Sequence, residues 1–179
     1  MPKTSRRLAP AKLSHVDERG QVRMVDVSDK LLTNREAVAE AVVTMSAAAR
    51  RAIRRREVKK GDPLQTARIA GMLAAKRTAD LIPLCHPLPL SHIDVILRPT
   101  PRGYAIRSRV RTSGRTGVEM EALVAVTTAA LTLYDMLKAV DRAMVIGAVR
   151  LVEKRGGRSG HYLATTVKGR GRQAEGQGK

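Results

Sequence analysis

The chain has 179 residues, of which 43% are hydrophobic, a length and composition that fit one globular domain with its own core. A single cysteine excludes an internal disulfide, and no stretch approaches the roughly 18 apolar residues of a membrane span, so we expect a cytoplasmic protein without a membrane segment. The net charge of +18 favours an anionic ligand. The absence of Phe and Trp removes the platforms on which single-stranded nucleic acid stacks, so nucleic-acid binding is disfavoured as the main function.

The first elements are predicted from alternation and capping. Residues 21–28, QVRMVDVS, alternate apolar and polar side chains and predict a short strand. Thr33 with Glu36 three residues later has the pattern of a capping box, which predicts an Ala-rich helix to about Glu57.

A second helix is predicted after the glycine at position 61. Asp62 is typical of an N-cap and Pro63 of the first helical position, and the apolar pattern continues to about Ala79. Pro83 then excludes a continuous helix.

The second half of the chain predicts a hairpin, a long helix and a last strand, over residues 92–98 with 104–111, 118–140 and 144–152 respectively. The predicted order is β, α, α, β, β, α, β. This order indicates an α+β fold, with a ferredoxin-like antiparallel four-stranded sheet, helices packed on one face and an additional helix. We expect one domain over residues 13–162, between basic flexible tails at 1–12 and 163–179.

The stretch LIPLCHPLPLSHIDV places Cys85 and His86 in a loop with three prolines. The fixed φ angles of those prolines stiffen the loop, and rigid loops on a scaffold often carry functional groups. A hydrogen-bonded structural histidine and an inert packed cysteine are the alternatives.

Two further groups of side chains belong to the predicted long helix. Asp135 and Lys138 are three residues apart and share one helix face, where they could be acid–base partners or a plain surface ion pair. Glu119 and Glu121 begin the helix, where acidic side chains are also favoured by the helix dipole. Because sixteen residues separate Glu119 from Asp135, about 24 Å of helix lies between them, and a site that uses both must be built from facing subunits.

Two glycine-containing stretches are candidate anion sites. KRGGRSG, residues 154–160, resembles a nest of backbone N–H groups among cations, although it equally suits a flexible exit to the tail. In KKGD, Lys60 precedes the capped start of a helix, where the ammonium group and the helix dipole act together.

The longer stretches LSHVDERGQVRMVDVSDK, KKGDPLQTARIAGMLAAKRTADLIPLCHPLPLSHIDV and SGRTGVEMEALVAVTTAALTLYDMLKAVDRAMVIGAVRLVEKRGGRSG resemble the cyclic pyranopterin monophosphate synthase family, also called molybdenum cofactor biosynthesis protein C. The resemblance runs from about Leu13 to Tyr162. It departs from the family at Ala79, where many relatives are expected to have an aromatic residue, but no catalytic position is altered.

The resemblance implies a lyase of molybdopterin synthesis that converts (8S)-3′,8-cyclo-7,8-dihydroguanosine 5′-triphosphate to cyclic pyranopterin monophosphate and releases pyrophosphate. It also implies a homohexamer of three dimers with active sites at subunit interfaces, and no resident cofactor beyond a magnesium ion that could accompany the triphosphate. By motif, the implied catalytic residues are Lys60, His86, Asp135 and Lys138. The implied substrate-binding residues are His86 again with Arg35, Leu84, Cys85, Glu119, Met120 and Glu121.

Two other classes of function stay open from the residues alone. A binding module could dock its basic helix end and tails on RNA or on an acidic protein, and a purely structural oligomer is a weaker alternative. Release of pyrophosphate from the cyclic triphosphate discriminates between an enzyme and these alternatives.

Overall fold

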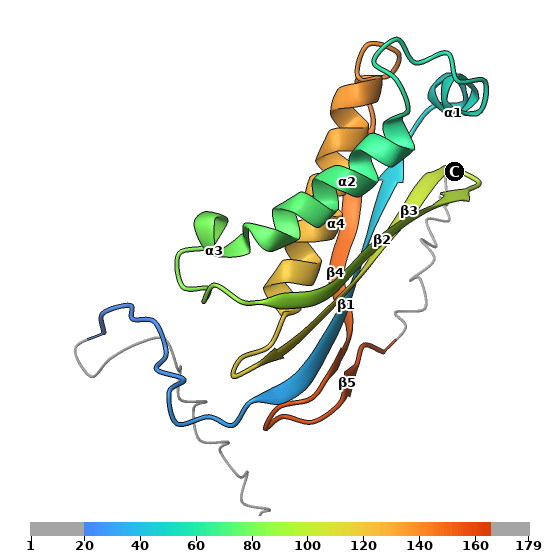
Figure 1. Ribbon diagram of the computed structural model, residues 1–179. Coiled ribbons are helices and arrows are strands. Elements are labelled where there is room, and N and C mark those ends of the chain that lie inside the picture. Colours follow the sequence, from blue (N-terminus) through green and yellow to red (C-terminus); the bar gives the residue numbers. More distant parts are fainter. Residues whose placement is uncertain (1–19, 166–179) are drawn as a thin grey trace, which may run out of the picture.

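The computed structural model describes residues 20–165, and both predicted basic tails lie wholly or mostly outside this range. Three helices and a short fourth one accompany five strands (Figure 1). In chain order the elements are β1 (Thr33–Thr44), α1 (Ala47–Arg54), α2 (Pro63–Lys76), α3 (Thr78–Leu81), β2 (Leu90–Thr100), β3 (Gly103–Gly114), α4 (Glu119–Leu137), β4 (Val145–Arg155) and β5 (Tyr162–Leu163).

The strands form one antiparallel sheet in the order β2-β3-β1-β4-β5. The first four have the ferredoxin-like arrangement, in which helices connect β1 to β2 and β3 to β4. The α+β prediction is therefore confirmed, whereas the predicted strand number of four is wrong. The fifth strand is a two-residue edge strand in which Tyr162 and Leu163 pair with Lys154 and Glu153.

The helix predicted from Thr33 to Glu57 is wrong over most of its length. Thr33–Thr44 is the strand β1, which pairs with β3 on one side and β4 on the other, and only Ala47–Arg54 of this stretch is helical. Ala37, Ala39, Ala41 and Val43 recur every second residue, and all are fully buried. Ladder hydrogen bonds on both edges and this period-two burial outweigh the helix propensity of alanine.

The strand predicted at residues 21–28 is also wrong. Only Val22 makes an isolated bridge, and the rest of the segment has no regular structure. Met24 and Val22 are exposed, so the alternation there reflects no buried sheet face. The backbone is instead held by side chains, since the Val25 carbonyl oxygen lies 3.0 Å from Nε2 of His86.

The other predicted elements are confirmed with modest shifts. Asp62 caps α2 by accepting hydrogen bonds from the backbone N–H groups of Leu64 and Gln65, at 2.9 and 3.1 Å. The helix ends at Lys76, and α3 follows as a separate turn before Pro83.

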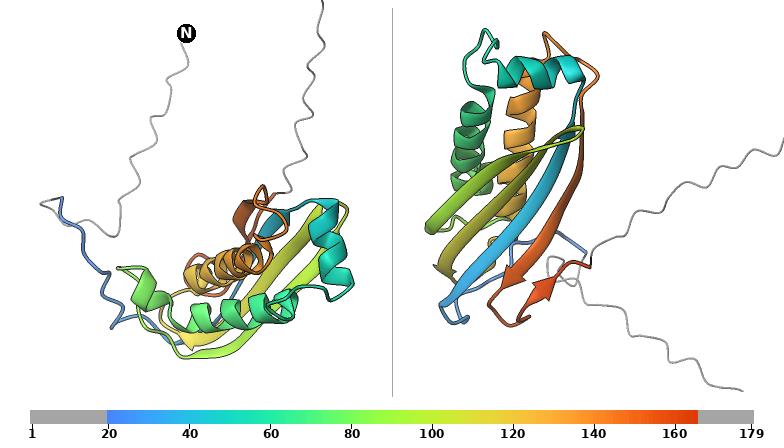
Figure 2. Two further views of the ribbon diagram at one scale, coloured as in Figure 1. Left: turned by 90° about the horizontal axis from the view of Figure 1, so that it is seen from above. Right: turned by 90° about the vertical axis from the view of Figure 1, so that its right-hand side faces the viewer.

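The core lies between the sheet and the pair α2 and α4, which cover one face of the sheet (Figure 2). Helix α4 packs on both the sheet and α2, and its buried residues include Ala122, Ala125, Ala129 and Leu133. By length and composition α4 resembles a membrane span, the single such helix among residues 20–165, but it is the central core helix of the fold. This position leaves its two ends at opposite ends of the molecule.

Candidate functional site

Asp135 lies between two lysine side chains. Its Oδ2 accepts a hydrogen bond from Nζ of Lys60 at 2.8 Å, and its Oδ1 lies 2.8 Å from Nζ of Lys138. Lys60 also donates to the backbone carbonyl oxygen of Asp135 at 3.1 Å. Asp135 belongs to the last turn of α4 and Lys138 is the C-cap, whereas Lys60 comes from the loop before α2. The fold thus unites two motifs that are distant in the sequence.

The two ammonium groups determine the charge state of this cluster. Hydrogen bonds from Lys138 and then Lys60 lower the pKa of Asp135 to about 2, so the carboxylate is ionised at neutral pH. The hydrogen bond to Asp135 raises the pKa of Lys138, which therefore keeps its proton. All three side chains are about half exposed, at 51 to 53%, so both cations can be reached by a ligand.

Most of the other predicted residues meet in a pocket of about 250 Å³. The proline-rich loop forms one wall, the start of α4 a second, and the segment before β1 a third. The predicted residues in this lining are Leu84, Cys85, His86, Glu119, Met120 and Glu121, and the lining also includes Val25, Val27, Lys30, Leu88, Thr116 and Gly117.

Glu121 is the most perturbed acid of the pocket. Its side chain is only 3% exposed, and Oε2 has no hydrogen-bond partner among residues 20–165. Burial, with a smaller effect of the nearby Glu119 charge, raises the pKa of Glu121 to about 7. Burial likewise raises the pKa of the Cys85 thiol, which stays protonated and is therefore a poor nucleophile.

A larger hollow of about 760 Å³ adjoins the pocket and shares Lys30 and Thr116 with it. Arg35 lies in this hollow and donates to the carbonyl oxygens of Gly114 and Arg115, at 3.0 and 3.1 Å. Gly157 and Arg158 of the KRGGRSG stretch line the same hollow.

The KRGGRSG stretch is also tied to the start of α4. Nζ of Lys154 donates to Oε1 of Glu119 at 3.1 Å and to Oγ of Ser159 at 2.6 Å. Neither Lys30 nor Lys154 was predicted individually as a site residue from the sequence. An isolated lysine in a polar segment has no periodicity or spacing that marks it.

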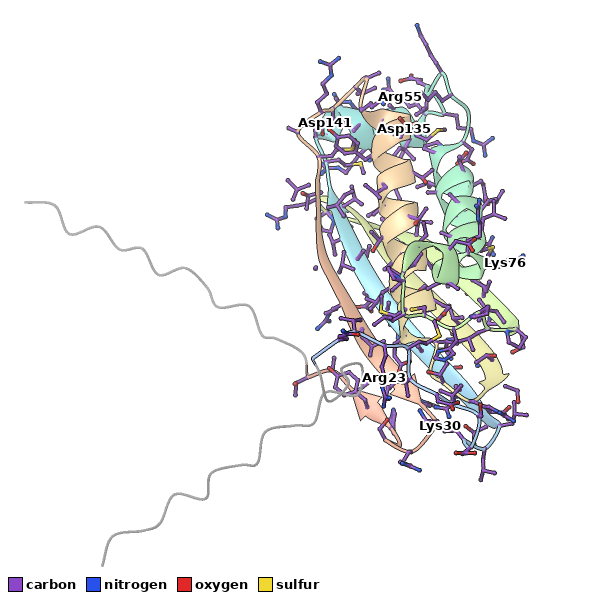
Figure 3. The ribbon with its side chains drawn as sticks, turned by 90° about the vertical axis from the view of Figure 1, so that its left-hand side faces the viewer. Arg23, Lys30, Arg55, Lys76, Asp135 and Asp141 are labelled. Atoms are coloured by element: carbon purple, nitrogen blue, oxygen red, sulfur yellow. The ribbon has the colours of Figure 1, made fainter. Side chains whose placement is uncertain are left out.

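The two groups of residues lie at opposite ends of α4. The helix is continuous from Glu119 to Leu137, and Asp135 is at one end of the molecule while Lys30 is at the other (Figure 3). The structure therefore brings together Lys60, Asp135 and Lys138, and separately His86 and Glu121, but it does not unite the two groups within one chain.

Neither group of side chains has the arrangement of a metal site. Within residues 20–165, no three His, Cys, Asp or Glu side chains are placed to hold a metal ion. The first group combines two cations with a carboxylate, and the second combines carboxyl groups with an imidazole, which suits binding of an anion and proton transfer.

The ferredoxin-like α+β fold thus carries two separate groups of ionisable side chains, one at each end of α4. A family model described as the MoaC family matches residues 24–157. Several curated relatives are named cyclic pyranopterin monophosphate synthase. One from Nostoc sp. is 56% identical over 155 residues, which are 86% of this chain and 92% of the relative.

Two other relatives agree. The protein from Pelotomaculum thermopropionicum is 59% identical over 152 residues, 84% of this chain and 89% of the relative. That from Thermomicrobium roseum is 56% identical over 154 residues, 85% and 93% of the two chains. The chain therefore belongs to the MoaC family, which comprises lyases of molybdenum cofactor biosynthesis that act on a nucleotide-derived substrate. The resemblance drawn from the sequence is confirmed.

Proposed function

We propose that this chain converts (8S)-3′,8-cyclo-7,8-dihydroguanosine 5′-triphosphate to cyclic pyranopterin monophosphate with release of pyrophosphate. The observation that carries the proposal is the pair of ammonium groups held at 2.8 Å on either side of Asp135. In the phosphate step a substrate hydroxyl attacks the α-phosphorus, and the bond to the bridging oxygen of the leaving pyrophosphate breaks. Two fixed cations stabilise the negative charge that gathers on that oxygen.

The charge states suggest separate roles within this cluster. An Asp135 with a pKa of about 2 is too weak a base for proton abstraction, so its role is to orient the lysines. Lys60 and Lys138 then bind phosphate oxygens, and either ammonium group can donate a proton to the leaving group.

The ring-opening and ring-closing steps need proton transfers near neutral pH. Glu121, with a pKa of about 7, is suited to both accepting and donating a proton. His86 is held by its contact with the Val25 carbonyl oxygen and faces the same pocket. Leu84, Cys85 and Met120 shape the pocket around the purine-derived ring of the substrate, and Arg35 borders this pocket.

The assembly follows from the division of the site. We propose that each active site combines the Asp135 end of α4 from one copy with the Glu121 end from another. The midpoint between these ends is Thr128, and a two-fold axis there would pair two α4 helices antiparallel. The outward residues between the ends are neutral, and Leu131 is 56% exposed, as are the adjacent α2 residues Ile69 and Leu73 at 56 and 55%.

Charge favours the same pairing. Lys60 and Lys138 would face Glu119 and Glu121 of the second copy across the interface. Three such dimers make the homohexamer that the resemblance implies. A cytoplasmic location and a magnesium ion that arrives with the triphosphate belong to the same proposal.

The direct test incubates the purified protein with the cyclic triphosphate and measures pyrophosphate. We expect turnover by the natural chain and its near-complete loss in Lys138→Ala. The control Lys76→Ala removes a lysine from the end of α2 and should retain activity. Near-normal turnover by Lys138→Ala would refute the assigned roles, and an intact assembly without any turnover would favour a binding module.

A further inference from the structure

Helix α1 and the loop after it carry an uncompensated basic surface. Five exposed side chains define this α1 basic surface, namely Arg51, Arg54, Arg55, Arg56 and Lys59. The opposite side of the helix packs Ala49, Ala52 and Ile53 into the core, and the helix contains no acidic residue. The only ion pair on the surface joins Arg55 to Glu57 at 3.9 Å, with both side chains mostly exposed.

Seven arginines elsewhere in residues 20–165 form ion pairs with carboxylates at 4.0 Å or less. They are Arg68, Arg77, Arg107, Arg109, Arg111, Arg150 and Arg155. By contrast, the side chains of Arg51, Arg54, Arg56 and Lys59 have no ion pair or hydrogen bond within residues 20–165. Unpaired basic side chains also occur elsewhere in residues 20–165, at Arg23, Arg98, Arg102, Arg142 and Arg158, but residues 51–59 place four of them together on one surface.

This surface adjoins the Lys60–Asp135–Lys138 cluster. The loop that carries Arg55 and Lys59 continues directly into Lys60, and Figure 3 shows Arg55, Asp135 and Asp141 at the same end of the molecule. The start of α1 is fixed to the segment after α4, because the Ser46 backbone N–H donates to Oδ2 of Asp141 at 2.7 Å. The α1 basic surface therefore has a fixed place beside the two reactive ammonium groups.

We propose that the α1 basic surface captures the triphosphate group of the substrate and delivers it to Lys60 and Lys138. This inference rests on the proposed function. Like charges on a low-dielectric surface raise the local concentration of an anion and the rate of its encounter. The five cations do not touch the reacting atoms, so they lower KM and leave kcat unchanged. The lack of stacking aromatics argues against a single-stranded nucleic acid as the occupant.

The test compares Arg51→Gln/Arg54→Gln with the control Arg68→Gln/Arg77→Gln. Both pairs remove two positive charges, but the control arginines are already neutralised by Asp94 and Asp80. At ~20 mM ionic strength we expect a KM about fivefold higher in the α1 variant alone, with kcat retained. At ~1 M salt, where the screening length falls to ~3 Å, the difference should vanish. An unchanged KM, or the same rise in the control, would overturn the capture role.

A second measurement does not depend on turnover. Binding of inorganic tripolyphosphate, followed by calorimetry, should weaken in the α1 variant and not in the control, even if the natural chain proves inactive. Arg51→Lys/Arg54→Lys keeps the charge and should retain both the KM and the tripolyphosphate affinity of the natural chain, which separates lost charge from lost folding. If a labelled single-stranded RNA binds the natural chain and not the α1 variant, while KM and tripolyphosphate affinity stay unchanged, the surface serves nucleic acid and the inference is wrong.

Discussion

The Asp135 carboxylate accepts a hydrogen bond from the Lys60 ammonium group at 2.8 Å, although 75 residues separate them in the sequence. This contact fastens the loop before α2 to the last turn of α4. A charged hydrogen bond of this kind fixes geometry more than it adds stability, because both side chains are about half exposed. The contact is therefore a positioning device for the two lysines.

Asp135→Asn should impair catalysis far more than folding. The amide cannot hold two ammonium groups by charge, so we expect kcat to fall by about 10²-fold or more. The unfolding free energy at pH 7 should change little, because solvent screens ion pairs between exposed side chains. Steady-state kinetics and urea unfolding measure the two quantities. A variant that keeps its kcat would show that Lys60 and Lys138 do not need the Asp135 carboxylate to hold them in place.

Low pH should have the same effect as this substitution, because it protonates the Asp135 carboxylate. Because the folded-state pKa of Asp135 lies below its ordinary value, its ion pairs contribute stability above pH ~4 that is lost as the pH falls toward 2. Acid unfolding of the natural chain and Asp135→Asn should therefore converge at the acid end. Curves that stay parallel down to pH 2 would contradict the lowered pKa.

Glu121→Gln should change how stability depends on pH. The folded state holds the Glu121 proton up to a pKa of about 7, so the natural chain binds more protons folded than unfolded between pH ~4.5 and 7. Its stability is lowered progressively across that window and stays lowered above it. Relative to the natural chain, Glu121→Gln should gain up to about 3 kcal/mol between pH 4 and pH 8. Urea unfolding of both proteins over this pH range measures the gain. A difference in unfolding free energy that does not change with pH would contradict a raised pKa of the buried Glu121.

Gly71→Ala should destabilise the fold although alanine is the better helix former. A methyl group on Gly71 of α2 would lie 2.7 Å from the Ala125 carbonyl oxygen of α4, closer than the two helices can allow without moving. We expect a loss of about 1–3 kcal/mol of unfolding free energy. Gly147→Ala is the control, because no atom lies within 4 Å of that position. A stabilised Gly71→Ala would show that the helices separate easily.

Gly157→Ala should disturb the hollow beside the pocket. Gly157 has a φ of 75°, and a side chain there would strike the Arg35 guanidinium group. Displacing Arg35 releases the carbonyl oxygens of Gly114 and Arg115, so we expect a raised KM for the cyclic triphosphate. Gly160→Ala has the same backbone strain, at φ 65°, but open space, and it should have the smaller effect on KM. Equal effects would assign the loss to backbone strain alone.

The fold could be predicted where local pattern and tertiary position agree. The α4 helix is apolar around most of its circumference because it packs against both the sheet and α2. The first strand could not be predicted, because Thr33 and Glu36 satisfy a capping box and the alanines favour a helix. Only pairing with β3 and β4, which come 59 or more residues later, makes this stretch extended.

The site was predictable from motifs but not from geometry. Asp135 and Lys138 share a helix face by spacing, and Asp62 marks a capped helix beside Lys60. Nothing in those spacings places the two stretches in contact, since the contact depends on how α2 packs along α4. The separation of Glu119 from Asp135 did follow from helix rise alone. It predicted that the two groups of candidate residues lie apart within one chain, as they do in the structure.

The shared active site is tested most directly by mixing two inactive variants. Lys138→Ala and His86→Ala damage opposite ends of α4, so a dimer of one copy of each contains one intact site and one doubly substituted site. Random pairing gives about half mixed dimers, hence about a quarter of the natural pyrophosphate release. Co-expression of the two chains supplies this random mixture, which is assayed without selecting the mixed dimers. Recovery to about that level is the predicted result, and mixed assemblies as inactive as either parent would contradict a site built from two copies.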